Sequence, residues 1–268
     1  MIKVKRAFLY LILIIVSIIS VFPLYWMFSA ATNTSIDVVR GKLIPGTQLL
    51  TNIKNLNATY NLTGALWNSF RYAFVQTTIS LIICSLAGYG FEIYHDKYKD
   101  RLMTLLLSAM MVPFVAIMIP LFQLFSKIGL LNSAVGFMLP TLATPLLIML
   151  FRQSARSFPK DIIEAARLEG LNELQIFFRM FIPSMRSTYA AAMTITFMAA
   201  WNNYLWPKVI MTTDSSITMP MLVANLKEGY VTDYGMLMVA VLLCTIPTAI
   251  IFFLLQKSFA EGITGAVK

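Results

Sequence analysis

Charge is scarce in this sequence. Only 12% of the 268 residues are Asp, Glu, Lys or Arg, about half the share that is usual in soluble domains. Hydrophobic residues reach 58%, which indicates lipid as the surrounding solvent. The net charge of +9 does not favour nucleic-acid binding, because too little polar chain remains to build a basic face. Basic loops beside a membrane explain it better.

Cysteine and histidine are also nearly absent. Cys84 and Cys244 lie in apolar runs, so the sequence predicts two small core residues and no disulfide framework. His95 is the only histidine, which leaves a His-based metal site or proton relay without its second member. The sequence also has no clustered carboxylates and no Ser–His pair. We therefore predict no metal site and no enzyme activity in this chain.

Six long stretches lack charge altogether. An apolar helix of about 20 residues crosses a hydrocarbon core of roughly 30 Å. We predict an all-α, polytopic membrane protein with six transmembrane helices, all within one domain over residues 1–268. The predicted spans are about 8–30, 70–91, 102–125, 135–151, 187–206 and 234–256. The first stretch is too long for a signal-peptide core, so we expect it to be a retained helix.

The distribution of Lys and Arg predicts the orientation. With a cytoplasmic N-terminus, 14 of the 21 basic residues fall in inside segments and seven in outside segments. This bias places both termini in the cytoplasm. Two long outside loops follow, at about 31–67 and 208–233, together with one long cytoplasmic loop at 152–186.

The cytoplasmic loop contains two short helix patterns. Pro159 and Asp161 suit a helix start, and Gly170 can end that helix in a left-handed conformation. Asn172 is a suitable N-cap for a second helix reaching Phe181. Pro183 is expected to break the second helix before the fifth span. The loop is therefore predicted to form a helix-turn-helix.

The loop is unusually apolar for a solvated segment. On the first helix, Ile162, Ala165, Ala166 and Glu169 are expected to share one face. The apolar residues could pack on the cytoplasmic ends of the spans, or they could insert into a groove of a partner protein. The pattern alone does not choose between these two interpretations.

The spacing of this loop resembles a known signature. Glu164, Ala165 and Ala166 are followed by Gly170 and, after nine residues, by an apolar segment that ends in Pro183. This resembles the EAA signature of binding-protein-dependent ABC importer permeases. Met180 and Ile182 replace the usual Ile and Leu of that signature, which are apolar exchanges of similar size. Glu169 stands where sugar permeases often have Asp.

Further segments extend the resemblance over nearly the whole chain. They are similar to the shorter, maltose-type permease subunit of the carbohydrate-uptake branch. The matching positions are Trp67–Phe70, Ala87–Tyr89, Trp201–Asn203 with Pro207, and the tail residues Glu261, Gly262, Gly265, Ala266, Val267 and Lys268.

The resemblance implies a multi-protein importer in a bacterial inner or plasma membrane. Its expected partners are a second permease subunit in a heterodimer, a cytoplasmic ATPase dimer, an external solute-binding protein, a sugar and membrane lipid. No cofactor is expected in this chain, because ATP and Mg²⁺ would be bound by the ATPase. Gly41 and Gly46 have P-loop spacing, but Thr47 and Gln48 follow in place of Lys and Ser or Thr.

The signature residues would couple the chain to the ATPase. The resemblance implies this role for Glu164, Ala165, Ala166, Glu169, Gly170 and Pro183. Glu164 would meet a basic residue of the ATPase, whereas Arg167, three residues further on, offers a local partner instead.

Two further sites are expected on the sugar's route. Trp201, Asn202, Asn203 and Tyr204 are candidates for lining the path, although residues at the outer end of a span also suit an interface belt. In the outer loop, the T-x-P element formed by Thr218, Met219 and Pro220 implies contact with the binding protein, unless this loop is a simple connector.

Two alternatives remain. An ion-coupled transporter or channel would usually carry ionisable residues within its spans, and the six charge-free stretches hold none. An ABC permease for another solute, such as a sugar phosphate or polyol, fits the same signature.

Overall fold

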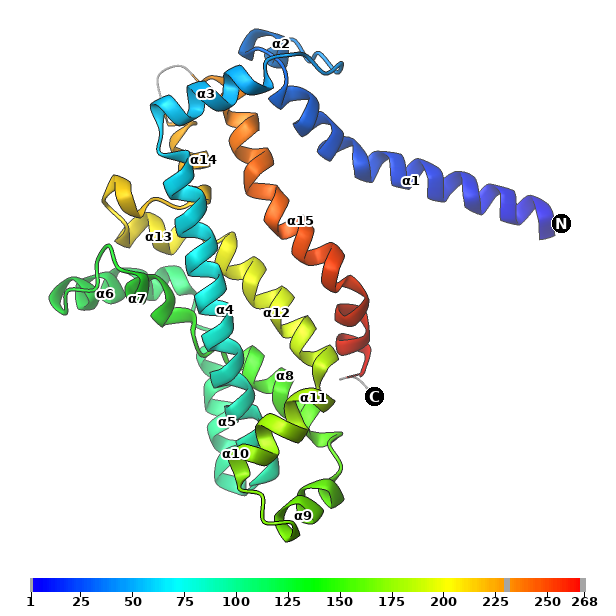
Figure 1. Cartoon of the computed structure of the whole chain (residues 1–268), viewed down its shortest axis with the longest axis vertical. Coiled ribbons are helices and arrows are strands. Elements are labelled where there is room, and N and C mark those ends of the chain that lie inside the picture. Colours follow the sequence, from blue (N-terminus) through cyan, green and yellow to red (C-terminus); the bar gives the residue numbers. More distant parts are fainter. Residues whose placement is uncertain (1, 229–231, 266–268) are drawn as a thin grey trace. The chain divides into compact units, whose positions relative to one another are not determined.

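The computed structural model describes residues 2–228 and 232–265, with side chains for 5–6, 8–228 and 232–257 (Figure 1). Its regular structure is helical, and the described residues contain no strand, so the all-α prediction is confirmed. The helices of the first half are α1 (Ile2–Ala31), α2 (Ser35–Val39), α3 (Leu49–Thr59), α4 (Leu62–Ile93), α5 (Lys97–Ala109), α6 (Phe114–Lys127), α7 (Ala134–Met138) and η1 (Leu139–Thr141). Those of the second half are α8 (Pro145–Arg156), α9 (Lys160–Leu168), α10 (Glu173–Ile176), η2 (Phe177–Phe181), α11 (Ile182–Ser184), α12 (Arg186–Trp201), α13 (Leu205–Ile210), η3 (Asp214–Ser216), α14 (Met219–Asn225) and α15 (Tyr234–Gly265).

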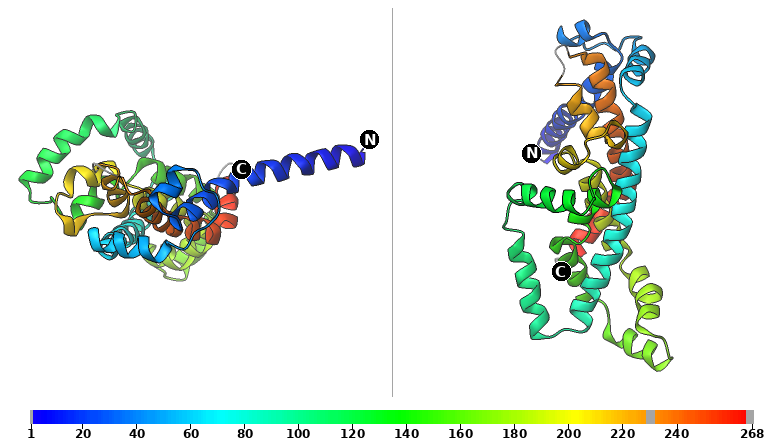
Figure 2. Two further views of the ribbon diagram at one scale, coloured as in Figure 1. Left: turned by 90° about the horizontal axis from the view of Figure 1, so that it is seen from above. Right: turned by 90° about the vertical axis from the view of Figure 1, so that its left-hand side faces the viewer.

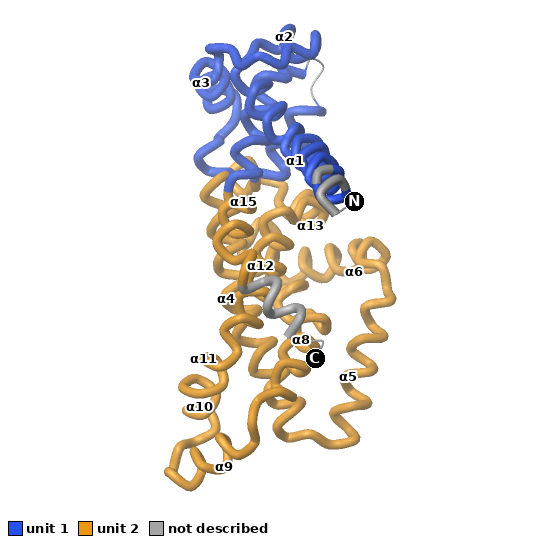
Figure 3. The backbone as a smooth tube through the Cα atoms, turned by 90° about the vertical axis from the view of Figure 1, so that its right-hand side faces the viewer, with its two compact units in different colours: residues 1–65, 219–246 blue, residues 66–218, 247–268 orange. Residues whose placement is uncertain are grey.

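The chain forms two compact units (Figure 3). Unit 1 contains residues 1–65 and 219–246, and unit 2 contains residues 66–218 and 247–268. Unit 1 is held by polar contacts around the end of α1, where the Asn52 side chain donates to the carbonyl oxygens of Ala31 and Asn33. All the loop and cavity residues described below belong to unit 2, except Met219 and Pro220.

Three helices are long and apolar enough to cross a membrane. They are Phe8–Ala31 within α1, the whole of α4, and Tyr234–Lys257 within α15. They correspond to the predicted spans 8–30, 70–91 and 234–256. The helix α4 starts earlier than the charge-free stretch because Arg71 is accommodated within it. The Arg71 guanidinium donates to Asn68 Oδ1 at 3.1 Å and to the Tyr72 hydroxyl at 3.0 Å.

The predicted spans 102–125 and 135–151 are not straight helices. Between α5 and α6 the chain bends by 95°, and between the α7–η1 segment and α8 it bends by 55° (Figure 2). Proline lies at both breaks: Pro113 is the N-cap of α6, and Pro145 is the first residue of α8. A residue before proline avoids the helical conformation, and Thr144 is accordingly extended. Counting each bent pair as one span gives up to five candidates.

The predicted fifth span, 187–206, is also divided. The helix α12 ends at Trp201 after 16 residues, and α13 starts at Leu205. With this division the total of six spans remains a prediction. The tail motif at 261–268 lies outside the residues whose side chains are described.

The helices α4 and α8 of unit 2 pack closely on one another. A Cβ at Gly88 would lie only 2.6 Å from Phe151 Cβ and 2.7 Å from the Arg152 backbone nitrogen, so glycine permits this approach. Next to it, Cys84 is fully buried among apolar residues. The prediction of a core residue is therefore confirmed for Cys84, whereas Cys244 is only part-buried.

Candidate coupling loop and membrane cavity

The first loop helix starts and ends where the sequence predicts. Pro159 occupies the N-cap position of α9, and Asp161 lies in its first turn. At the other end, Gly170 has a φ of +81°. Its N–H donates to the Arg167 carbonyl, and the N–H of Leu171 donates to that of Ala166, both at 3.0 Å. This pair of bonds is a Schellman motif, which requires a left-handed residue at Gly170.

The second loop helix starts as predicted but does not end at Pro183. Asn172 forms a capping box with Gln175 at the start of α10. The chain then continues through the π-helical turn η2 into α11, which contains Pro183. The break falls at Met185, where φ is −100° and ψ is 22°. Proline is tolerated in the first turn of α11 because its missing N–H would have no partner there.

One side of the loop packs on the rest of unit 2. Tyr89 of α4 contacts the rings of Phe177 and Phe181, with centroids 5.4 Å and 4.9 Å apart. Ile163 and Ala166 of α9 are buried in the same cluster. The inward side of α9 is thus formed by Ile163 and Ala166, whereas Ile162, Ala165 and Glu169 of the face read from the spacing are exposed. A helix with apolar residues on two sides does not reveal from its spacing which side turns inward.

The other side of the loop is apolar and exposed. The Leu168 side chain is 90% exposed, and that of Leu174 is 61% exposed. Ile162 and Phe178 add exposed apolar area to the same loop. We call Ile162, Leu168, Leu174 and Phe178 the outward set. Part of the apolar loop therefore packs internally, and part is left for something outside this chain.

Glu164 does not pair with Arg167. The Arg167 Nε donates instead to Glu173 Oε1 at 2.7 Å, and this hydrogen bond is the main cause that lowers the pKa of Glu173. Glu164 is exposed and makes no ion pair with any described residue. It borders a small hollow of about 200 Å³ together with Lys160, Ile163, Arg167 and Ile93. Of the other signature residues, Ala165, Glu169, Gly170 and Pro183 are exposed, whereas Ala166 is buried.

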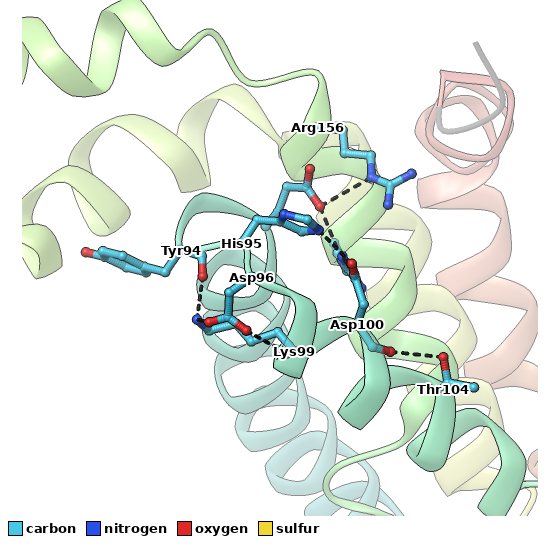
Figure 4. A network of polar contacts seen from close by, with 9 residues as sticks. Tyr94, His95, Asp96, Lys99, Asp100, Thr104 and Arg156 are labelled. Carbon is cyan, nitrogen blue, oxygen red and sulfur yellow. Dashed lines mark hydrogen bonds and ion pairs between the residues drawn. The ribbon is translucent and has the colours of Figure 1, made fainter.

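An ion network fixes the start of this loop (Figure 4). Arg152 of α8 donates to Glu92 of α4 at 3.2 Å and to Asp100 of α5, while its side chain is only 4% exposed. Arg156 shares the Glu92 carboxylate, and His95 contacts Asp100 at 3.0 Å. No pairing of Arg152 or Arg156 with Glu92 or Asp100 was predicted from the sequence, because the partners are more than 50 positions apart. The network ties three helices together beside the loop.

Two asparagines hold the loop that follows α13. Asn68 of α4 donates from Nδ2 to the carbonyl oxygens of Ser215 and Ile217, at 2.8 Å and 3.0 Å. Asn132, with a φ of 54°, accepts from the backbone N–H groups of Thr212 and Thr213. Asn68, which belongs to the Trp67–Phe70 segment noted in the sequence, thus has a structural role.

The predicted T-x-P element lies mostly inside the chain. Thr218 is 2% exposed and Met219 is fully buried, whereas Pro220 is part-exposed. Residues 212–215 of this loop are exposed.

The four residues expected to line the sugar path do not lie together. Trp201 is 2% exposed and stacks on Phe197, with ring centroids 5.9 Å apart. Asn202 and Tyr204 are exposed. Of the four, only Asn203 borders a cavity of about 350 Å³ between α4, α8 and α12. Sequence reasoning missed the other polar residues of that cavity, Gln76, Thr141, Thr144 and Thr196.

No group of three or more His, Cys, Asp and Glu side chains is placed to hold a metal ion in the described part of the chain. The geometry thus shows a helical chain with an apolar, partly exposed loop and, among its helices, a cavity without charged lining residues.

Comparisons with known proteins agree with this class. Residues 80–265 match the family described as binding-protein-dependent transport system inner membrane component. The lactose transport system permease protein LacG of Rhizobium radiobacter is 42% identical over 97% of this chain and 95% of its own length. The arabinooligosaccharides transport system permease protein AraQ of Bacillus subtilis is 30% identical, covering 99% and 97%. The sn-glycerol-3-phosphate transport system permease protein UgpE of Escherichia coli is 30% identical, covering 92% of each.

Solved structures show the same fold. A chain of a bacterial ABC transporter for the import of alginate superposes with a TM-score of 0.80, at 21% identity, over 95% of this chain and 96% of that one. The chain belongs to the family of inner membrane components of binding-protein-dependent transport systems. It is thus a multi-pass membrane permease subunit.

Proposed function

We propose that the chain is a membrane-spanning subunit of an ATP-driven importer that carries a neutral sugar, of di- or oligosaccharide size, delivered by an external binding protein. The outward set carries this proposal. Four apolar side chains stand exposed on a loop whose other face is packed, which is the arrangement of a docking surface. The lactose and arabinooligosaccharide relatives support the choice of a sugar.

The docking partner would be a cytoplasmic ATPase dimer, which binds ATP and Mg²⁺. The exposed Leu168 and Phe178 side chains would enter an apolar groove of that partner, and Glu164 would meet a basic residue at its rim. The charge of Glu164 is available for this contact because Arg167 is engaged by Glu173. The chain itself would act as the permease and not as the motor.

A second permease subunit would complete the membrane part as a heterodimer. The apolar window of α1 supports this, because none of it is buried within the chain. The Lys and Arg bias supports cytoplasmic termini in a bacterial inner or plasma membrane. With that orientation the loop at 212–215 faces outward and is available to the binding protein, whereas Thr218 and Met219 would support it from inside the chain.

Co-purification and uptake test the proposal together. The chain is produced with the permease, ATPase and binding protein encoded beside it, and uptake into proteoliposomes is measured for lactose, an arabino-oligosaccharide and sn-glycerol 3-phosphate. We expect ATP-dependent uptake of a neutral sugar. Uptake of sn-glycerol 3-phosphate alone would favour the sugar-phosphate alternative suggested by the third relative, and uptake driven by an ion gradient without ATP would favour a secondary transporter.

Single variants locate the docking surface. Leu168→Ser and Glu164→Ala are expected to lower both ATPase pull-down and uptake. Leu50→Ser is the matched control, since Leu50 is also an exposed leucine, at 71%, but lies on α3 in the outer segment. Full ATPase binding by both loop variants would show that the ATPase does not dock on the outward set.

Reporter fusions test the orientation. Fusions after Lys54 and after Asp214 are expected to read as external, and a fusion after Lys160 as cytoplasmic. An internal signal after Asp214 would contradict the proposed topology.

A further inference from the structure

A groove between α4 and α5 combines an apolar wall with a cationic end. Its volume is about 510 Å³, which lies within the range of small-molecule sites. Leu86 and Phe91 of α4 and Leu102 of α5 line its apolar part, and Lys99 in the first turn of α5 lines its other end together with Tyr94. All of these residues belong to unit 2.

The groove crosses the level at which the apolar part of α4 ends. The charge-free stretch 72–91 contains every α4 residue of the wall but not Lys99, so the wall lies at the depth of lipid tails and Lys99 lies at the interface. Tyr94 and Tyr98, which are 45% and 78% exposed, stand at the same boundary, where exposed tyrosines are common in membrane proteins. A molecule that fills the groove therefore meets apolar groups at one end and a cation at the other.

Gly90 keeps the groove open. A Cβ at Gly90 would have no atom within 4 Å, whereas a Cβ at Gly88 would press on α8. Packing within the chain thus explains the glycine at position 88 but not the one at position 90. Because glycine inside a helix lowers the stability of that helix relative to alanine, the open space above Gly90 points to a ligand from outside the chain.

The charges beside the groove leave an excess of cations. The three carboxylates of segment 92–101 already have cationic partners, among them Asp96, which contacts Lys99. The Lys99 ammonium uses two of its three donors within the chain and keeps one. Lys97 and Arg101, within two residues of Lys99, are exposed and form no ion pair with any described residue. This end of the groove therefore attracts an anion.

We propose that the groove binds one phospholipid with an acidic headgroup, whose phosphate faces Lys99 and one of whose acyl chains lies over Gly90. Basic pockets at the ends of membrane helices bind acidic lipids in this way. An apolar helix of another subunit would cover the wall but would take Lys99 out of water, which costs free energy. A free anion would leave the wall uncovered. The proposal follows from the membrane location of the family and does not depend on which solute is carried.

Native mass spectrometry of the full chain tests the choice of headgroup. The purified chain in detergent is titrated with dioleoyl phosphatidylglycerol or dioleoyl phosphatidylcholine, which have the same acyl chains and differ in headgroup charge. We expect one phosphatidylglycerol to bind more tightly than phosphatidylcholine. Lys99→Gln should weaken phosphatidylglycerol binding about 5-fold and leave phosphatidylcholine binding unchanged. Lys54→Gln is the matched control, because Lys54 is an exposed cation on α3, and it should bind both lipids as the wild type does.

A second variant tests the groove itself. Gly90→Leu places a side chain in the open space, where its Cβ meets no atom, and replaces glycine by a better helix former. The variant should therefore fold at least as well as the wild type, which circular dichroism checks. Binding of both lipids should weaken several-fold, because the leucine displaces the acyl chain. Ala109→Leu at the exposed end of α5 is the matched control and should bind both lipids normally.

Three results would overturn the proposal. The first is equal affinity of the wild type for the two lipids, which would remove the role of the headgroup. The second is phosphatidylglycerol binding that survives both Gly90→Leu and Lys99→Gln, which would place the lipid elsewhere on the chain. The third is unchanged lipid binding by Gly90→Leu together with loss of co-purification with the second permease, which would show that this subunit covers the groove.

Discussion

Replacing Arg152 tests whether the ion network stabilises the part of unit 2 beside the loop 152–186. Arg152→Met keeps the length of the buried stem and removes the guanidinium that joins Glu92 to Asp100. Removing one member of a buried pair costs about 3–5 kcal/mol, whereas exposed pairs contribute about 0–1 kcal/mol. Here the Arg152 side chain is 4% exposed but Asp100 is 48% exposed, and Arg156 still contacts Glu92.

These facts place the expected loss between the two limits, at about 2 kcal/mol, which is roughly a 30-fold change in the folded-to-unfolded ratio. The assay is denaturant unfolding of the purified chain in detergent, completed as a double-mutant cycle with Glu92→Gln. We expect a coupling energy of about 1 kcal/mol or more between positions 152 and 92.

The matched control is Arg186→Met, because Arg186 is exposed and forms no ion pair with a described residue. Equal losses for Arg152→Met and Arg186→Met, with no coupling to Glu92, would refute the stabilising role of the network.

Three further predictions concern single elements. Gly170→Ala should destabilise the loop by about 1–2 kcal/mol, because alanine is strained in the left-handed conformation, and the loop should be proteolysed faster. No atom lies within 4 Å of the new Cβ, so a steric clash adds nothing to this loss. Unchanged proteolysis would contradict the prediction. Asn68→Leu should loosen the loop that follows α13 and raise its amide exchange, because the carbonyl oxygens of Ser215 and Ile217 lose their donor. ATPase pull-down should not change, and amide exchange as in the wild type would count against the prediction. The Arg167 hydrogen bond lowers the pKa of Glu173 below its ordinary 4.5. The stability that this pair contributes, about 0–1 kcal/mol, is therefore complete above pH 4.5 and is lost as the pH falls through the lower pKa of the folded state. Glu173→Gln should remove this acid sensitivity of loop proteolysis, and an identical pH response in both proteins would overturn the assignment.

Local signals in the sequence predicted the loop helices well. Pro159, Gly170 and Asn172 act through backbone conformation and capping, which depend on neighbours a few residues away. The face of α9 that packs inward depends on Tyr89, more than 70 positions upstream, so it could not be predicted from the spacing of Ile162 and its neighbours.

The two bends could have been predicted from the prolines at which they occur. Pro113 and Pro145 lie within stretches that lack charge, and the length of a charge-free stretch says nothing about its straightness. The cavity carried a weaker signal, a lone Gln76 within the uncharged stretch 72–91. Its meaning required Thr141 and Thr196, which only the packing of three helices brings beside it.

The long helix α4 places two of these features on one straight element. Tyr89, on which the loop rings pack, and Gln76, at the cavity, are 13 residues apart, or about 20 Å along the axis at 1.5 Å per residue. The segment between them contains no proline, the commonest cause of a kink. A push on the loop would therefore tilt α4 as a rod, and the Gln76 amide would swing relative to its partner on η1. Such a lever would couple the packing of the loop rings on Tyr89 to the contact between Gln76 and Thr141.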